Sequence, residues 1–468
     1  MSTSSSSNFS GSISSVPSKP ATDPVFSLWL RVFAESSPFL EYIAPEESDA
    51  ATTLTPNALV SREEIYFLMQ TNETREAPDI FMRNEVAKLK DADLDWKVHE
   101  LDGPTQARTT VDGKKDVIVL CSNNYLGLAN HPKLKEASIK AVEEYGAGSG
   151  SVRVIAGTMR IHLELERVLA EYKGVEDAIV FQSGFAANSG CIQQLVGEGD
   201  LIVSDELNHG SIIDGCRLTP AKRVVYKHRD IDDLEKVLKQ NETGMRRILV
   251  ITDGVFSMDG DIAPLDKITN IAKNYGAMVY VDDAHGDGVL GDNGRGIVNH
   301  FRLEGKVDIE MGTFSKAFGV VGGYVVGSHA LKEYMWNKVR PYLLSGSHPP
   351  ATAGACIASI KLVQSDPSIV KTLWDNTRYF KKRLKDSGFD IGQSETPITP
   401  IMCGESSVAQ KLAKEAFEEG VFVLPIVYPM VARGKARIRT MVTASHTKED
   451  LDFALEVFQK GGKKLGLV

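Results

Sequence analysis

The sequence lacks long apolar runs, paired cysteines and a surplus of basic residues. No apolar run reaches the roughly 18 residues that a membrane-spanning helix requires, so we expect no membrane span. The five cysteines are scattered and form no Cys-x-x-Cys pair, which favours buried free thiols in a reducing compartment over a zinc site or a redox dithiol. The formal net charge of -9 argues against a nucleic-acid-binding protein, because phosphate contacts need a basic surface.

Residues 1–24 contain neither arginine nor the apolar stretch of a secretory signal. Their serine-rich, acid-poor composition is shared with organellar transit segments, but the first arginine of the chain is Arg31. The pattern favours a plain tail and a cytoplasmic location, with an organellar location as the alternative.

Two short amphipathic segments follow this tail. In the first, Phe26, Leu30 and Phe33 recur at helical spacing. The second begins at Ser61, and Glu64 three residues later completes a capping-box pattern. Neither segment carries recognisable chemistry, so we predict an arm that docks or binds a partner, with the compact fold beginning near Asp79.

The rest of the chain predicts an α/β fold with a second, smaller domain. A length of 468 residues exceeds what one hydrophobic core normally serves. From about Val117, short continuous apolar runs alternate with amphipathic helices, which is typical of a parallel sheet covered on both faces. Past Pro350, helices flank a few strands, which favours an α+β domain. The expected parts are an extension (1–78), an N-terminal arm (79–122), a large domain (123–350) and a C-terminal small domain (351–468).

Lys316 stands in "GTFSKAFGVVGGYVVG", a run that is otherwise small, hydroxylated or apolar. A buried ammonium tends to lose its proton, and a neutral lysine is a nucleophile that forms a Schiff base with a carbonyl. The same short motif also fits a surface lysine at a loop edge, so the stretch alone leaves both interpretations open.

Polar residues follow five of the apolar runs. Ligands of open α/β sheets bind outside the carboxyl ends of the strands, so these residues are candidates for one shared site. They are Ser183 to Phe185, Asp205 to His209, Asp253 to Ser257, Asp282 to His285, and Thr313 to Lys316.

Several of these residues suit a phosphate group. Gly184 precedes an expected helix, and the absence of a side chain lets backbone N–H groups approach an anion at the positive end of that helix. Ser257, Thr313 and Ser315 add hydroxyl donors. A glycine in a tight turn is the alternative for Gly184.

Three further residues suit an aromatic aldehyde with a basic ring nitrogen. His209 offers a flat ring for stacking, and Asp282 ends an apolar strand, where an unpaired carboxylate would be costly without a cationic partner. Pyridoxal phosphate would satisfy all of these residues at once: its phosphate suits the turn at Gly184, its ring suits His209 and Asp282, and its aldehyde suits Lys316. Singly, His209 also fits a helix cap or a core histidine, and Asp282 a turn aspartate. The string "DDAHG" could suggest a metal, but no other ligand cluster accompanies it, so none is expected.

From Phe81 to Val468 the chain resembles the α-oxoamine synthases, a family of fold-type I pyridoxal-phosphate enzymes with a large, mainly parallel-sheet domain and a smaller α+β domain. The motifs that carry the resemblance are "SNNYLGLANHP", "GAGSGSVRVIAGT", "FQSGFAAN", "SDELNHGSIIDG", "TDGVFSMDGDIAPL", "VDDAHGDGVLGDNGRG", "GTFSKAFGVVGGY", "RPYLLSGSHPP" and "GKARIRTMVTASHT". The resemblance implies that the substrates are a small amino acid and an acyl-CoA. It also implies a homodimer with shared active sites.

The resemblance further implies roles for individual residues. Lys316 corresponds to the Schiff-base lysine that also moves a proton, Asp282 to the partner of the pyridine nitrogen, and His209 to the stacking residue that also contacts substrate. Ser257 and His285 correspond to the groups that bind the phenolic oxygen. The residues on the phosphate side are Ser183, Gly184, Phe185, Thr313 and, from the neighbouring subunit, Ser345.

The substrate residues implied by the resemblance are Asn123 and Arg439, which would meet the amino acid. A planar guanidinium suits a carboxylate, so Arg439 is expected to hold the α-carboxylate. Val152 and Val154 occupy the positions of a Thr and an Asn in relatives that use succinyl-CoA, and apolar side chains cannot replace those polar groups. Succinyl-CoA is therefore disfavoured.

The segments "RPYLLSGS" and "YPMVARGKARIRTMVTASHT" resemble most the glycine C-acetyltransferases. We therefore expect glycine and acetyl-CoA to give 2-amino-3-oxobutanoate and CoA. The second choice is L-alanine with pimeloyl-CoA, giving 8-amino-7-oxononanoate, and the third is serine with palmitoyl-CoA. An aminotransferase on the same fold is the competing class of enzyme.

Overall fold

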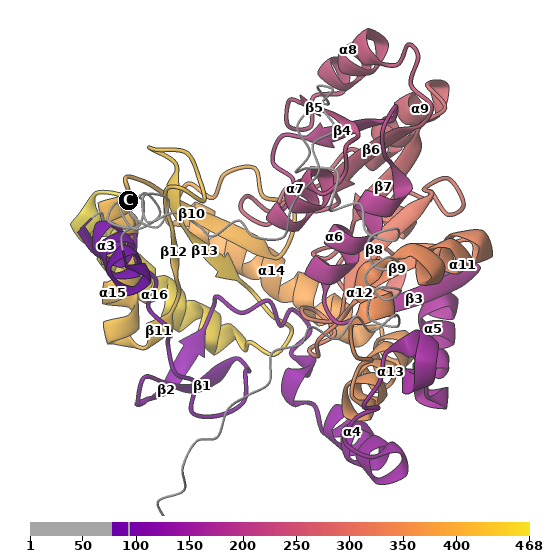
Figure 1. Ribbon diagram of the computed structural model, residues 1–468. Coiled ribbons are helices and arrows are strands. Elements are labelled where there is room, and N and C mark those ends of the chain that lie inside the picture. The colour runs from indigo at the N-terminus through magenta and orange to yellow at the C-terminus, as the bar shows by residue number, and fades with distance from the viewer. Residues whose placement is uncertain (1–76, 92–93) are drawn as a thin grey trace, which may run out of the picture. The chain divides into compact units, whose positions relative to one another are not determined.

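The computed structural model describes residues 77–91 and 94–468 of the chain (Figure 1). The chain divides into two units, Met1–Trp96 and Lys97–Val468. In the first unit the described part is mainly helix α3 (Pro78–Asp91), which has no buried residue. The amphipathic segments expected before Asp79, and the partner-binding arm predicted from them, lie outside the described residues.

A seven-stranded sheet forms the centre of the second unit, with strand order β3-β9-β8-β7-β6-β4-β5. Strand β9 runs in one direction, and all the other strands of this sheet run in the opposite direction. The strands β3, β4, β6, β7 and β8 therefore all end at the same edge of the sheet. The strands are β3 (Asp177–Phe181), β4 (Leu201–Asp205), β5 (Lys222–Tyr226), β6 (Ile248–Asp253), β7 (Met278–Asp282), β8 (Ile309–Thr313) and β9 (Gly323–Gly327).

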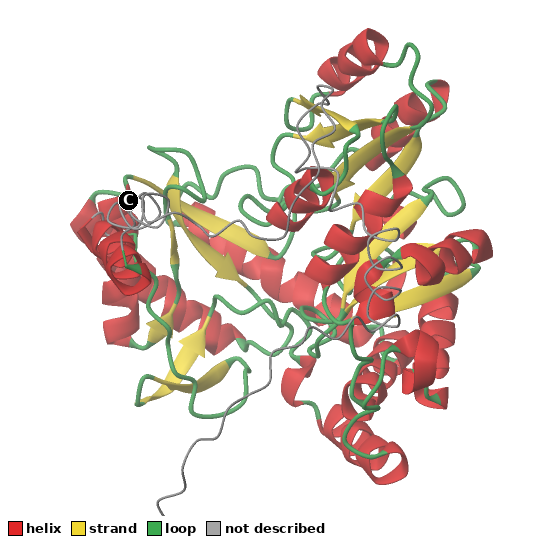
Figure 2. Cartoon of the chain, in the orientation of Figure 1, coloured by secondary structure: helices red, strands yellow, loops and turns green. Residues whose placement is uncertain are grey.

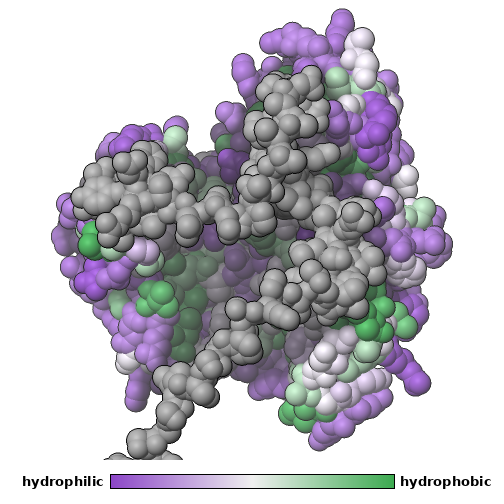
Figure 3. All heavy atoms as spheres, in the orientation of Figure 1, coloured by the Kyte–Doolittle hydropathy of each residue, from purple (hydrophilic) through white to green (hydrophobic). Residues whose placement is uncertain are grey.

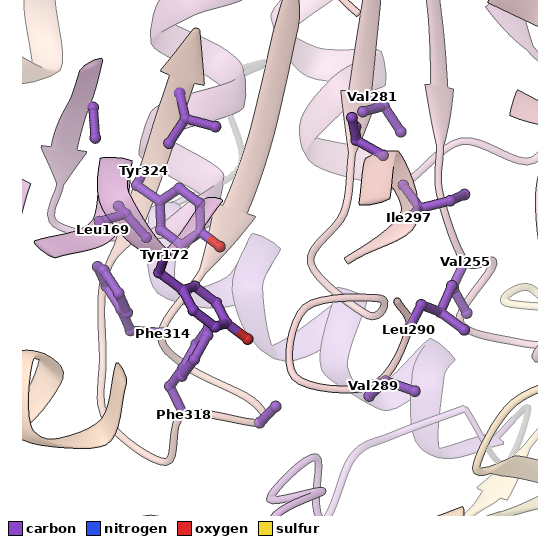
Figure 4. Close-up of a cluster of buried hydrophobic side chains, with 14 of the residues drawn as sticks. Leu169, Tyr172, Val255, Val281, Val289, Leu290, Ile297, Phe314, Phe318 and Tyr324 are labelled. Atoms are coloured by element: carbon purple, nitrogen blue, oxygen red, sulfur yellow. The ribbon is translucent and has the colours of Figure 1, made fainter. Parts of the chain in front are cut away.

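The apolar runs form this sheet because both of its faces are buried. Successive residues of one strand point to opposite faces, and they enter two different hydrophobic clusters. In β6, Val250 joins one cluster while Leu249 and Ile251 join the other. Part of the first cluster, including Tyr172, is drawn in Figure 4. Continuous apolar strands are thus explained by two-sided burial.

Helices cover both faces, as Figure 2 shows. The first cluster receives side chains from α4, α5, α8, α9 and α13, and the second from α6, α7, α11 and α12. The exposed face of α8 is mainly hydrophilic in Figure 3, whereas Leu234 and Leu238 of this helix are buried. The helices are α4 (Pro132–Tyr145), α5 (Arg160–Lys173), α6 (Gly184–Leu195), α7 (Gly210–Arg217), α8 (Ile231–Asn241), α9 (Leu265–Asn274), α10 (Ile297–His300), α11 (His329–Lys338), α12 (Arg340–Leu344) and α13 (Pro350–Ser365).

The C-terminal part of the chain packs around a hydrophobic cluster of its own. Its sheet has the order β10-β13-β12 and is antiparallel. Its elements are α14 (Ser368–Asp386), β10 (Ile398–Gly404), α15 (Ser406–Glu419), β12 (Pro425–Ile426), β13 (Ala436–Met441) and α16 (Lys448–Leu465). This α+β arrangement agrees with the expected fold class, while the exact domain boundaries stay a prediction.

The apolar run at Val117 does not join the seven-stranded sheet. It belongs to β2 (Lys114–Val119), which pairs with β1 (Arg108–Val111) and with β11 (Val421–Phe422). The side chain of Ile118 in β2 packs into the C-terminal hydrophobic cluster. Among the described residues, no helix is both long and apolar enough to span a bilayer.

Candidate active site

A cavity of about 220 Å³ lies at the edge where the parallel strands end. Because six strands end at this edge, side chains that are far apart in the sequence meet there. Asp253 and Asp282, for example, are directly paired residues at the ends of β6 and β7. Eight of the residues expected to bind the cofactor line the cavity: Ser183, Gly184, Phe185, His209, Asp282, His285, Thr313 and Lys316.

Lys316 lies in the loop that follows β8. The hydroxyl of Thr313 donates to the carbonyl oxygen of Gly322 at 2.6 Å and so closes this loop. Burial lowers the pKa of Lys316 to about 8, and the nearby charge of Arg439 adds to the decrease, although the Asp282 carboxylate opposes it. The amine is therefore neutral in an appreciable fraction of molecules near pH 8, as a Schiff-base nucleophile requires.

Asp282 presents a buried carboxylate to the cavity, with 5% of its surface exposed. Its Oδ2 accepts a hydrogen bond from Asn188 Nδ2 at 2.6 Å, and its Oδ1 accepts one from the backbone N–H of Ala284 at 3.0 Å. No basic side chain of the described residues forms an ion pair with Asp282. A buried carboxylate with donors but no countercharge suits the cationic ring nitrogen of a ligand.

Two histidines line the cavity in different ways. His209 is exposed and caps α7, because its Nδ1 accepts from the backbone N–H of Ser211 at 3.2 Å. The ring of His285 is buried, and its Nδ1 forms a hydrogen bond of 2.8 Å with the hydroxyl of Tyr125. Burial lowers the pKa of His285 well below its usual value, so this ring is neutral.

The start of α6 forms an anion-binding turn. The Ser183 hydroxyl caps the helix by accepting from the backbone N–H of Ala186 at 3.1 Å. The N–H groups of Gly184 and Phe185 precede the first intrahelical hydrogen bond and remain available to a ligand. Strand β9 passes very close to this turn, since a Cβ added at Gly323 would lie 2.3 Å from the Ser183 carbonyl oxygen. The geometry suits the expected phosphate.

The three remaining groups expected around the amino acid and the phenolic oxygen do not line the cavity. Ser257 lies in the turn after β6, and its carbonyl oxygen accepts from Arg439 Nη1 at 3.0 Å. Arg439 belongs to β13, so the C-terminal sheet contacts the turn through this side chain. The Oδ1 atom of Asn123 is buried and has no hydrogen-bond partner among the described residues. Such an unpaired acceptor suits a ligand N–H group.

Val152, Val154 and Ser345 also lie outside the cavity of this chain. Val152 forms an isolated antiparallel bridge with Gly346, so the two loops that carry these residues are neighbours. Val154 is 49% exposed. That Ser345 serves a neighbouring subunit, and that the two valines meet the acyl group, therefore both stay predictions.

Sequence reasoning missed three polar residues near the predicted ones, Tyr125, Asn188 and Ser211, and it named Asp253 as a candidate without giving it a role. Asn188 is the most detectable, because an amide inside the apolar run of α6 must find hydrogen-bond partners. Asp253 is buried, and burial raises its pKa well above the usual range, with the charge of Asp282 adding to the increase.

Three other buried carboxylates, those of Asp283, Asp287 and Glu310, come close enough together to hold a cation. The ammonium group of Lys173 already lies among them, 2.7 Å from Asp287 Oδ1 and 3.5 Å from Asp283 Oδ2, and it also pairs with Glu310. His285, which the metal alternative would require, is not a member of this group. The cluster is accounted for as a buried ion-pair network.

A family model described as class I and II aminotransferases matches residues 115–458. The 8-amino-7-oxononanoate synthase of Symbiobacterium thermophilum is 58% identical over 388 residues, which cover 83% of this chain and 99% of that protein. The enzyme of the same name from Thermosipho melanesiensis is 56% identical over 384 residues, or 82% of this chain and 98% of that protein.

Solved structures of two enzymes are also similar to this chain. The S. paucimobilis serine palmitoyltransferase with a bound pyridoxal phosphate–myriocin aldimine superposes with a TM-score of 0.79 at 33% identity, covering 84% of this chain and all of that one. The 8-amino-7-oxononanoate synthase of Francisella tularensis superposes with a TM-score of 0.65 at 29% identity, covering 74% of this chain and 98% of that one.

These relatives correct the expected substrates. The glycine C-acetyltransferase reading is wrong, because curated relatives at 51–58% identity are 8-amino-7-oxononanoate synthases. The expected fold class and the expected cofactor, pyridoxal phosphate, are confirmed. The chain belongs to the α-oxoamine synthase family of fold-type I, pyridoxal-phosphate-dependent enzymes.

Proposed function

We propose that this chain is an 8-amino-7-oxononanoate synthase, which joins L-alanine to a pimeloyl thioester and releases carbon dioxide and the free thiol. The observation that carries the proposal is the identity of 51–58% to enzymes of that name over 98–99% of the length of most of them. The cavity supports it, because its side chains suit every group of the cofactor that the reaction needs.

Four sets of residues would hold the cofactor. Lys316 would take the aldehyde, Asp282 the ring nitrogen and His209 the face of the ring. The turn that contains Gly184 would take the phosphate. When bound, pyridoxal phosphate supplies an electron sink next to the α-carbon of the amino acid.

The side chains of the protein then bind the amino acid and move its proton. The carboxylate of L-alanine would replace the Ser257 carbonyl as the partner of Arg439, because a guanidinium binds a carboxylate through two parallel hydrogen bonds. The lowered pKa of Lys316 suits it to accept the α-proton at Nζ near neutral pH. Asp282 would keep the ring nitrogen protonated, which would strengthen the electron sink.

We further propose a homodimer in which each chain completes the site of the other. Ser345 and Val152 lie on neighbouring loops outside the cavity of their own chain. Val154 is exposed and therefore free to face a second subunit. In the dimer, the two valines would line the path of the acyl chain, and Ser345 would reach the phosphate of the partner site.

A substrate panel tests the proposed activity. Purified holoenzyme would be mixed with L-alanine and pimeloyl-CoA, with glycine and acetyl-CoA, and with serine and palmitoyl-CoA, and thiol release and product mass would be recorded. We expect the first pair to react about 10-fold faster or more than the others, a ratio that one apolar pocket can provide. Faster reaction of another pair would refute the assignment, and release of a keto acid without thiol would indicate an aminotransferase.

A further inference from the structure

Asn188 lies outside the lining of the cavity and connects two residues that line it, Asp282 and His209, through hydrogen bonds. It is fully buried in α6, and all of its polar atoms are used. Its Nδ2 donates to Asp282 Oδ2 at 2.6 Å and to Ser211 Oγ at 2.9 Å, while its Oδ1 accepts from the hydroxyl of Tyr280 at 2.8 Å. Ser211 Oγ in turn lies 2.7 Å from His209 Nδ1.

The direction of these hydrogen bonds follows from the carboxylate. An ionised Asp282 only accepts, so the amide must face it with its NH₂ group. The second N–H of Asn188 then points to Ser211 Oγ, whose own hydrogen is free to donate to His209 Nδ1. The backbone N–H of Ser211 donates to the same nitrogen at 3.2 Å.

Two donors on Nδ1 require this nitrogen to be an acceptor. The proton of the neutral His209 ring therefore sits on Nε2. The protein atoms around the His209 ring displace water from it and lower its pKa. The Asp282 carboxylate opposes this decrease and the charge of Lys316 adds to it, so the neutral form is favoured. The orientation of Asp282 and the tautomer of His209 are thus set by one connected network.

We propose that Asn188 is a positioning residue that orients Asp282 toward the ring nitrogen of the cofactor and, through Ser211, holds His209 as the Nε2–H tautomer. The proposal rests on the proposed function only in placing the cofactor at Asp282 and His209, and it is independent of which acyl thioester reacts. The competing role for Asn188 is packing alone, in which the amide merely satisfies the buried hydroxyl of Tyr280.

The test uses holoenzyme loaded with pyridoxal phosphate that is ¹⁵N-labelled in its ring. In Asn188→Ala we expect the ring-nitrogen signal to move toward its unprotonated value. We also expect kcat with L-alanine to fall about 10-fold or more, the effect of losing one hydrogen bond to a charged group, while KM changes little. The matched control is Gln193→Ala, which removes another amide of α6 that donates only to the Ser189 carbonyl oxygen at 2.7 Å.

Ser211 tests the second arm of the network. With ¹⁵N-histidine labelling, Ser211→Ala should shift the His209 Nδ1 signal, because this nitrogen then accepts one hydrogen bond fewer. Ser211→Thr keeps the hydroxyl and should restore the wild-type signal. If both signals stay at their wild-type positions in Asn188→Ala and Ser211→Ala, the proposal is overturned, even if the melting temperature falls. Should Asn188→Ala fail to fold, the His209 Nδ1 signals of Ser211→Ala and Ser211→Thr decide whether the proposal stands. Because both signals are read without substrate, a negative substrate panel leaves this test valid.

Discussion

Replacement of Lys316 by alanine is expected to slow thiol release from the acyl thioester about 1000-fold or more. The substitution removes both the amine that holds the cofactor and the base that accepts the α-proton, and general-base catalysis alone is worth about 100- to 10,000-fold. The loop itself should keep its shape, because its closing hydrogen bond runs from Thr313 to Gly322 and does not involve Lys316. Thiol release by the holoenzyme measures the effect.

The control for this substitution is Lys411→Ala. Lys411 is an exposed residue of α15, outside the cavity, and its replacement should leave the rate unchanged. If Lys316→Ala keeps more than a tenth of the wild-type rate, the assignment of the base is wrong.

Replacement of Asp282 by alanine should slow the exchange of the α-proton of L-alanine about 100-fold or more. Removing one partner of a buried charge pair costs about 3–5 kcal/mol, and here the charge left unpaired is that of the ring nitrogen. The ring should then lose its proton, and the electron sink should weaken. The cofactor should remain attached to Lys316, because that bond does not involve the carboxylate.

Deuterium uptake into L-alanine in D₂O, followed by NMR without an acyl donor, isolates this step. Asp386→Ala serves as the control, since Asp386 is exposed on α14 and, within the described part of the chain, forms an ion pair only with Lys382 of the same helix. Wild-type exchange in the Asp282 variant would refute its role as partner of the ring nitrogen.

Most of the site could be predicted because one rule connects sequence and structure. In a parallel sheet the carboxyl ends of the strands share an edge, so residues such as His209, Asp282 and Lys316 can be assigned to one site without knowing any side-chain contact. The same apolar runs, buried on both faces, predict the sheet itself.

The residues that were missed depend on contacts between elements that are far apart in the sequence. Asn188 and Tyr125 act on Asp282 and His285 from elements that the sequence does not mark as neighbours. Strand β9 was not predicted either, since the stretch "GYVVG" was considered only as part of the surroundings of Lys316. The structure shows a further reason for Gly323, whose strand lies against the turn at Ser183.

The choice of substrate could not be predicted because the argument from Val152 and Val154 excludes only one acyl group. Two apolar side chains disfavour the short succinyl carboxylate, but they do not distinguish acetyl from longer chains. Moreover, both residues lie outside the cavity of the chain that carries them, so the cavity itself gives no information on the acyl group that they would meet. The proposal of L-alanine and a pimeloyl thioester therefore rests on the similarity to named relatives and not on these residues.

The most direct test of the account is to find which lysine carries the cofactor. Holoenzyme would be reduced with borohydride, digested and mapped by mass spectrometry. The account predicts a phosphopyridoxyl group on the peptide that contains Lys316 and on no other peptide. Label on a different lysine would contradict the placement of the active site at the carboxyl ends of these strands.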